Sequence, residues 1–106
     1  MSTFVIIFRQ VSPLTDADRQ QRAAQTADWA RRLQAQGHEL VPHMLAPEGP
    51  QLGTPLPGLA AIPAVTALLF ITAHDLEEAA RIAQSHPALQ YGAHAEVHAW
   101  TTPVRS

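Results

Sequence analysis

Two short runs of the chain are apolar at almost every position, and they constrain the fold more than any other feature. Residues 3–9 (Thr-Phe-Val-Ile-Ile-Phe-Arg) and residues 64–72 (Ala-Val-Thr-Ala-Leu-Leu-Phe-Ile-Thr) are rich in β-branched and aromatic side chains, which favour strands. Successive side chains of a strand point to opposite faces of its sheet, so both faces of these strands are apolar. Such strands are normally buried on both sides. The two runs therefore predict the central strands of a sheet that is covered on both faces.

Two helices are predicted between and after these runs. The first spans about residues 15–36 and has two alternative starts, at Ser12 and at Thr15, either of which would cap a first turn. The second begins after Asp75, where Glu78 completes a capping box. The predicted apolar stripes are Ala23, Ala27, Ala30 and Leu33, with Trp29 on the flank, in the first helix and Leu76, Ala79, Ala80 and Ala83 in the second.

The remaining chain predicts two further strands and one long loop. Residues 38–46 form a weaker strand that Pro42 confines to a sheet edge, because proline removes a hydrogen-bond donor from the ladder. Residues 47–63 are rich in proline and glycine and form a semi-rigid loop of a length that is often functional. Residues 93–101 alternate cleanly as a last strand. One face of that strand carries Ala93, Ala95, Val97 and Ala99, and the other carries His94, Glu96, His98 and Trp100.

The predicted order βαββαβ is that of a split βαβ or ferredoxin-like sandwich of the α+β class. In its usual arrangement the first and third strands are central in a four-stranded antiparallel sheet, and both helices lie on one face. The position of Pro42 in the second strand agrees with this order, since that strand lies at an edge. With 106 residues, the chain fits a single domain spanning residues 1–106.

Two helices cover only one face of such a sheet, so the second apolar face needs another cover. Both faces of the central strands are apolar, with Phe4, Ile6 and Phe8 opposite Val5 and Ile7 in the first strand, and Val65, Ala67, Leu69 and Ile71 opposite Leu68 and Phe70 in the third. Soluble monomers rarely expose so large an apolar surface. We therefore expect a homodimer in which a second copy packs sheet against sheet. The alternative is that the loop at 47–63 folds over this face.

Composition excludes several function classes. The chain has no cysteine, lysine or asparagine, which rules out disulfides, thiolate metal sites, cysteine nucleophiles and a Walker-A loop. Its net charge of −2 and its uncharged third strand, which has one aromatic residue, argue against a nucleic-acid partner. The apolar stretch at 59–73 is interrupted and too short for a membrane helix, and no basic segment precedes residues 4–8. We expect a cytoplasmic protein with no membrane partner and no cofactor.

The C-terminal third combines a strand, an acidic helix cap, a proline turn, a glycine and a closing strand. These features are residues 71–83 (Ile-Thr-Ala-His-Asp-Leu-Glu-Glu-Ala-Ala-Arg-Ile-Ala), His86-Pro87-Ala88-Leu89, Gly92 and Glu96-Val97. Together with a Trp-bearing first helix that ends at Gly37, and with Pro47-Glu48-Gly49 in the loop, this pattern resembles the YCII-related (DGPF-type) domain family. The resemblance implies a dimeric α/β-barrel fold with ligand clefts between sheet and helices or between the two sheets.

The chain departs from that family at the residues that would carry chemistry. Members proposed as enzymes have a histidine on the first helix paired with an aspartate near its end, where this chain has Thr26 and Ala35. The pair is absent, or it is displaced to Asp28 and His38. The Asp-Gly-Pro-Phe stretch is replaced by Leu-Gly-Thr-Pro at residues 52–55.

The most chemical motif is His94-x-Glu96-x-His98, which places two imidazoles and a carboxylate on one strand face. Such groups bind metals or move protons near neutral pH, so these three are the candidate catalytic residues. Neighbouring side chains of one extended strand do not converge easily on one ion. A polar patch lining a small-molecule cleft is therefore the favoured interpretation over a metal site.

Three further residues are candidate ligand contacts. Arg9 is the last residue of an otherwise apolar strand. Its guanidinium either holds a carboxylate ligand or simply reaches solvent at the strand end. His43 is either a ligand contact or a core or interface histidine, and Trp100 either packs or lines the same cleft as His94. The other flanking residues have structural interpretations: His74 and His86 as capping or turn residues, and Arg19, Arg22, Arg31 and Arg32 as a solvated helix face.

Two function classes remain open from the sequence. The first is a small-molecule enzyme that uses a cleft lined by the fourth strand, with histidine as acid or base. The second is a non-catalytic ligand-binding or regulatory module on the same fold. The missing family pair favours the second, and the His94 face keeps the first open.

Overall fold

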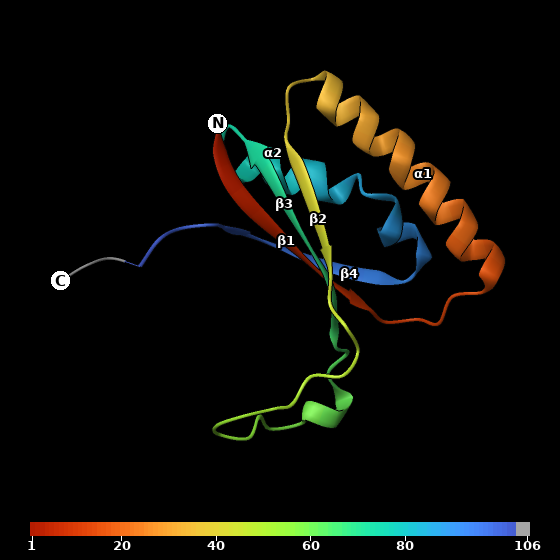
Figure 1. Cartoon of the computed structure of the whole chain (residues 1–106), viewed down its shortest axis with the longest axis vertical. Coiled ribbons are helices and arrows are strands. Elements are labelled where there is room, and N and C mark those ends of the chain that lie inside the picture. Colours follow the sequence, from red (N-terminus) through yellow and green to blue (C-terminus); the bar gives the residue numbers. More distant parts are fainter. Residues whose placement is uncertain (104–106) are drawn as a thin grey trace.

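The computed structural model describes residues 1–103 as a four-stranded antiparallel sheet with two helices on one face (Figure 1). The strands are β1 (Ser2–Gln10), β2 (Leu40–Met44), β3 (Val65–Ala73) and β4 (Ala93–Ala99), the helices are α1 (Asp16–Ala35) and α2 (Leu76–Gln84), and the short 3-10 helices are η1 (Leu59–Ala61) and η2 (Pro87–Tyr91). The sheet order is β2-β3-β1-β4. The predicted ferredoxin-like α+β fold is confirmed, with β1 and β3 central and the proline-bearing strand at an edge.

Helix α1 begins at Thr15, which decides between the two predicted starts. The Thr15 hydroxyl accepts a hydrogen bond from the Asp18 backbone N–H at 3.1 Å, and the Asp18 carboxylate accepts one from the Thr15 N–H at 3.3 Å. The predicted stripe is wrong in part, because Trp29 and Leu33 are the buried residues and Ala23 and Ala27 are exposed. Burying an indole removes more apolar surface than burying alanines, so Trp29 sets the rotation of the helix.

Helix α2 begins as predicted, with the Asp75 carboxylate accepting from the Glu78 N–H at 2.8 Å. The Glu78 carboxylate reaches back to the N–H of His74 rather than that of Asp75, so the predicted capping box is shifted by one residue. The predicted stripe omitted Ile82, the bulkiest side chain that the helix buries. The buried positions are Ala79, Ile82 and Ala83, whereas Leu76 and Ala80 are exposed.

The two faces of the sheet differ in their cover. The helix-side face contributes the alternate residues of the central strands to the core, namely Phe4, Ile6, Phe8, Leu69 and Ile71. The opposite face, called here the open face, carries Val5, Ile7, Leu68 and Phe70 at its centre, with Val41 and His43 of β2 and His94, Glu96 and His98 of β4 beside them. Alternation along the strands therefore holds as predicted, and neither helix lies on the open face.

The loop between β2 and β3 projects from the end of the sheet and does not cover the open face (Figure 1). Its base is fixed by the Arg9 guanidinium, which donates to the Pro63 carbonyl at 2.7 Å, and by the Leu45 N–H, which donates to the Thr66 carbonyl at 3.0 Å. The side chains between these anchors are exposed, as in Leu52 at 87%. The alternative that this loop folds over the sheet is therefore wrong for this chain.

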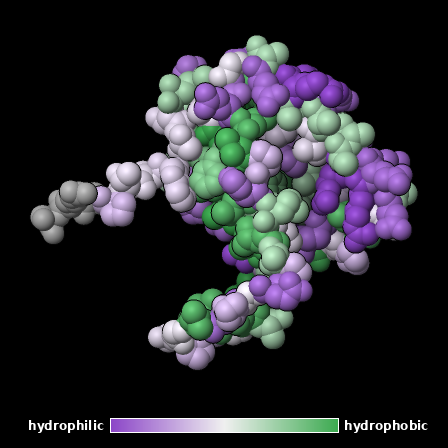
Figure 2. Space-filling view, in the orientation of Figure 1, coloured by the Kyte–Doolittle hydropathy of each residue, from purple (hydrophilic) through white to green (hydrophobic). Residues whose placement is uncertain are grey.

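Hydrophobic residues gather over the sheet and again on the projecting loop, whereas the surface of α1 is mostly hydrophilic (Figure 2). None of the helices within residues 1–103 has both the length and the apolar character required to cross a bilayer.

Candidate functional site

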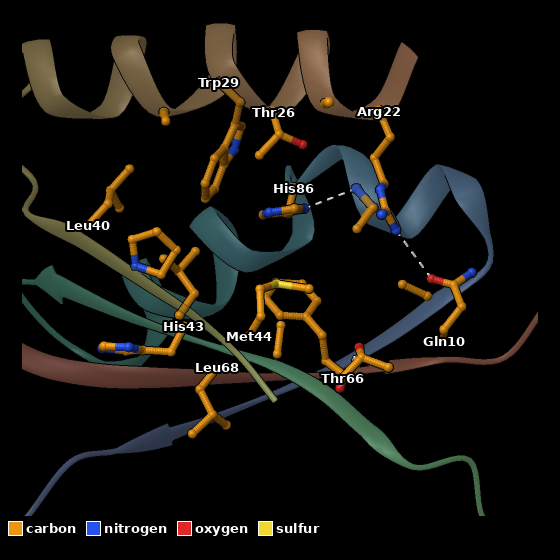
Figure 3. A pocket seen from close by; sticks show the side chains of 18 of the residues that line it. Gln10, Arg22, Thr26, Trp29, Leu40, His43, Met44, Thr66, Leu68 and His86 are labelled. Atoms are coloured by element: carbon orange, nitrogen blue, oxygen red, sulfur yellow. Dashed lines mark hydrogen bonds between the residues drawn. The ribbon is translucent and has the colours of Figure 1, made fainter. Parts of the chain in front are cut away.

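A cleft of about 390 Å³ lies between α1 and the helix-side face of the sheet (Figure 3). Residues of α1, β1, β2, β3, η2 and the first position of β4 line it, and most of its wall is apolar. The apolar lining includes Phe8, Trp29, Leu40, Met44 and Leu69, and the polar lining includes Gln10, Arg22, Thr26 and His86. A mostly apolar cleft with a few polar groups is the usual form of a small-molecule site.

His86 lies in this cleft as a neutral imidazole. It is the N-cap residue of η2, and its Nδ1 accepts the Ala88 backbone N–H at 3.0 Å. The ring packs against Phe8 and Trp29, with centroid distances of 4.7 Å and 4.6 Å. Burial, assisted by the positive charge of Arg22, lowers the pKa of His86 from 6.5 to about 4. Because Nδ1 is an acceptor, the proton of the neutral ring is on Nε2, which makes this atom a hydrogen-bond donor.

Arg22 stands at one end of the cleft and is half-buried. Its Nη1 donates to the Gln10 amide oxygen at 3.4 Å (Figure 3). Gln10 is itself held, because its Nε2 donates to the carbonyls of Tyr91 at 2.7 Å and Ser12 at 2.6 Å. The prediction that Arg22 belongs to a solvated helix face is wrong, although Arg19 is exposed as expected.

A sequence signal for Arg22 did exist. Arg22, Thr26, Trp29 and Leu33 follow one another at spacings of four, three and four residues, which places them on a single face of α1. A stripe built on Trp29 therefore includes the two polar residues of the cleft. The predicted stripe was built on the alanines and missed them. His86 was correctly interpreted as a capping residue, but its place in the cleft depends on how α1 crosses η2.

The predicted catalytic residues lie on the open face, away from this cleft. His98 Nε2 and the Glu96 carboxylate are 3.0 Å apart, and Arg9 Nε lies 4.0 Å from the same carboxylate. The hydrogen bond with His98 is the main cause that lowers the pKa of Glu96. His94 is exposed on the same face, and within residues 1–103 the hydrogen-bond partner of the Glu96 carboxylate is His98. Within residues 1–103, no three His, Asp or Glu side chains cluster closely enough to hold a metal ion.

The other two predicted contacts also belong to the open face. His43 and Trp100 both meet Phe70 edge-on, with ring centroids at 5.8 Å and 4.9 Å. His43 borders the cleft, but its ring projects from the opposite side of β2 from Leu40 (Figure 3). Strand β4 contributes only Ala93 to the cleft. The cleft within this chain is therefore a different place from the polar face of the fourth strand, whose predicted role as the lining of a cleft stays a prediction.

The family's histidine–aspartate pair has no counterpart in the structure. Thr26, at the position expected for the histidine, lines the cleft, but Ala35 is exposed and lies outside it. The displaced pair is not formed either, because Asp28 is paired with Arg31 and His38 Nδ1 lies 2.7 Å from the Thr72 carbonyl oxygen. Of the two positions at which the resemblance places the pair, the cleft therefore includes only that of Thr26.

Comparison with known proteins shows a likeness of fold. No family model matches the chain, and no curated protein is significantly similar to it. Among solved structures, 5-chloro-2-hydroxyhydroquinone dehydrochlorinase (TftG) from Burkholderia phenoliruptrix AC1100, in complex with 2,5-dihydroxybenzoquinone, is similar with a TM-score of 0.58 and 17% sequence identity. The match covers 94% of this chain and 95% of that chain. At this level of identity the likeness shows that the two chains share a fold.

Proposed function

We propose that this protein binds a small planar organic molecule in the cleft between α1 and the sheet, and that it does so as a YCII-related homodimer in the cytoplasm. The cleft carries the proposal. Its volume of about 390 Å³ lies within the range of small-molecule sites, and apolar walls surround a few polar groups at one end. These are the features of a site that selects a ligand by shape and then orients it.

The aromatic lining favours a flat ligand. Phe8, Trp29 and His86 present three rings to one region of the cleft. Rings of this kind bind planar molecules by stacking or by edge contacts. The structurally similar TftG was solved with 2,5-dihydroxybenzoquinone, which is a planar ring with oxygen substituents, and this supports the same shape of ligand here.

The neutral state of His86 favours a role in binding a ligand oxygen, and in polarising it, over a role in abstracting a proton. A neutral imidazole whose Nδ1 is occupied offers its Nε2–H to a ligand oxygen, and a pKa of about 4 makes it a weak base at neutral pH. We therefore place a hydrogen-bond donor at this position, and not a general base.

The two tryptophans of the chain provide an internal control for a binding test. Trp29 lines the cleft, whereas Trp100 lies on the open face. In a titration with planar ring compounds followed by two-dimensional NMR, we expect the Trp29 indole N–H signal to shift and that of Trp100 to stay. The variant Ala30→Leu, which narrows the cleft, should weaken binding, and Ala24→Leu, on the exposed side of α1, should not. Binding that leaves Trp29 unmoved would contradict the proposal.

The homodimer is supported by the open face. Ile7, Leu68 and Phe70 are only partly buried there, and neither the helices nor the long loop covers them. Packing this face against a second copy would remove its apolar surface from water. We expect sedimentation equilibrium to give a dimer, Leu68→Asp to give a monomer, and Leu52→Asp, on the projecting loop, to remain dimeric. A monomeric wild-type protein at micromolar concentration would exclude this arrangement.

Acid–base chemistry on the open face is a second candidate function, favoured by the His98–Glu96 pair at 3.0 Å. A second copy packed on this face would enclose the pair and Arg9 in a cavity between the sheets. Turnover of a bound ring compound, followed by mass spectrometry, should then be lost in His98→Gln. The test distinguishes the candidates, because turnover that survives His98→Gln excludes this pair, and binding without turnover favours a non-catalytic module.

A further inference from the structure

Arg22 carries a charge that the binding of a neutral ring does not explain. The residue is half-buried and lines the end of a cleft whose wall is mostly apolar. Taking a charged group out of water is unfavourable unless a partner of opposite charge or several hydrogen bonds replace the water. The contacts of Arg22 therefore indicate what the cleft is suited to receive.

Those contacts are weak compared with those of four other arginines in the described chain. Arg9, Arg19, Arg31 and Arg81 each have a carboxylate within 4.0 Å. Within residues 1–103, the only hydrogen bond found for Arg22 is the long one of 3.4 Å to the neutral amide of Gln10, and no carboxylate lies within 4.0 Å of it. Arg32 also lacks a carboxylate, but it is exposed and can be hydrated.

A second group in the cleft offers the same kind of contact. The Nε2–H of the neutral His86 ring is a donor, and its Nδ1 is already used by the Ala88 N–H. The cleft thus holds a cation and a donor beside an aromatic wall formed by Trp29 and Phe8. Among the described residues that line it, none is acidic.

We infer that the ligand of this cleft is a planar organic anion, with its ionised oxygens against Arg22 and its ring against Trp29 and Phe8. This inference rests on the proposed binding function and names the ligand class. An aromatic carboxylate and the enolate of an acidic hydroxyquinone share the required chemistry, which is a flat ring bearing a delocalised oxyanion. A guanidinium binds two such oxygens side by side, and this contact gives both affinity and orientation.

The test compares two ring compounds that differ in charge and match in shape, 2-naphthoate and 2-naphthamide. Dissociation constants are measured by NMR on the Trp29 indole signal for the wild type, Arg22→Gln, Arg22→Lys and the control Arg19→Gln, which lies one turn earlier on the exposed side of α1. We expect the wild type and Arg19→Gln to prefer the anion by roughly 10- to 100-fold, as for a charge-assisted hydrogen bond, and Arg22→Gln to lose that preference. Arg22→Lys should retain part of it.

A second readout is independent of affinity. A bound anion beside His86 should raise the pKa of that ring, because it offsets the charge of Arg22, whereas the bound amide should leave that charge uncompensated. Equal affinities for the two compounds, or a preference that survives Arg22→Gln, would overturn the inference while leaving the cleft as a binding site. If neither compound shifts Trp29, both the inference and the proposed function are wrong.

Discussion

Replacing His86 with asparagine is predicted to remove most of the pH dependence of stability between pH 4 and pH 6.5. Burial first, and the charge of Arg22 second, lower the pKa of His86 from 6.5 to about 4 in the folded protein. In this window the unfolded chain takes up a proton that the folded chain does not. The contribution of the neutral His86 ring to the free energy of unfolding is therefore complete above pH 6.5, and it is lost progressively as the pH falls toward 4.

The size of this effect follows from the shift. Each pKa unit corresponds to about 1.4 kcal/mol, so a change from 6.5 to about 4 corresponds to about 3 kcal/mol as an upper bound. That is a large share of the total stability of a small domain, which is typically about 5–15 kcal/mol. The wild-type protein should therefore become markedly less stable as the pH falls from 6.5 toward 4.

Asparagine is the suitable replacement, because its side-chain oxygen can accept the Ala88 N–H that His86 Nδ1 now accepts. The variant loses the ring contacts with Phe8 and Trp29, so we expect it to be less stable than the wild type by about 1–3 kcal/mol at pH 7.5, and this difference should shrink as the pH falls. His74→Asn is the matched control, because His74 is exposed and its backbone N–H, which bonds Glu78, is unchanged.

The assay is urea unfolding at fixed protein concentration, followed by far-ultraviolet circular dichroism at several pH values from 4 to 7.5. Between pH 7.5 and pH 4, the wild type and His74→Asn should lose more stability than His86→Asn does, by up to about 3 kcal/mol. Parallel curves for the wild type and His86→Asn would refute the reasoning, because they would mean that the His86 ring titrates alike in the folded and unfolded chain.

Two further predictions concern a glycine turn before β4 and the N-cap of α1. Gly92→Ala should lower the free energy of unfolding, measured in urea, by about 3 kcal/mol, because at a φ of +81° the added Cβ would lie 2.7 Å from the Ser12 Cβ. Gly53 has a similar φ of +83° but open space around it, so Gly53→Ala should lower the free energy of unfolding by at most about 1 kcal/mol. Equal costs would exclude the close contact. Thr15→Ala should cost about 1 kcal/mol, because the hydroxyl that accepts the Asp18 N–H is lost, and an unchanged thermal midpoint would mean that this cap does not stabilise α1.

The strands and their order were predictable because dense β-branched and aromatic runs have few alternatives. Residues 3–9 and 64–72 fall within β1 and, apart from Ala64, within β3, and the proline of β2 correctly placed that strand at an edge. Both helices were also predicted to within about a residue at their starts. Their buried faces were predicted less well, because alanines recur at helical spacing on more than one side, and the larger Trp29 and Ile82 decide the rotation.

The candidate site was not predictable from local patterns, because its residues come from separate elements. Gln10, Arg22 and His86 meet only when α1 crosses above β1 and η2. The motif His94-x-Glu96-x-His98 was conspicuous in the sequence, and the structure does bring Glu96 and His98 together. Periodicity alone placed them on one face, but it did not show that this face is turned away from the cleft.

The cleft exists because of what the first half of α1 lacks. A helix that packs tightly on a sheet presents large apolar side chains along its whole inner face. Here large apolar residues occur only toward the C-terminal end, at Trp29 and Leu33, and the preceding positions on that face are Arg22 and Thr26. Neither side chain fills the space above Ala67 and its neighbours with apolar volume. The same two residues, Arg22 and Thr26, therefore weaken the packing of α1 and supply the cavity and its charge. This is the pattern expected where function is favoured at the expense of stability.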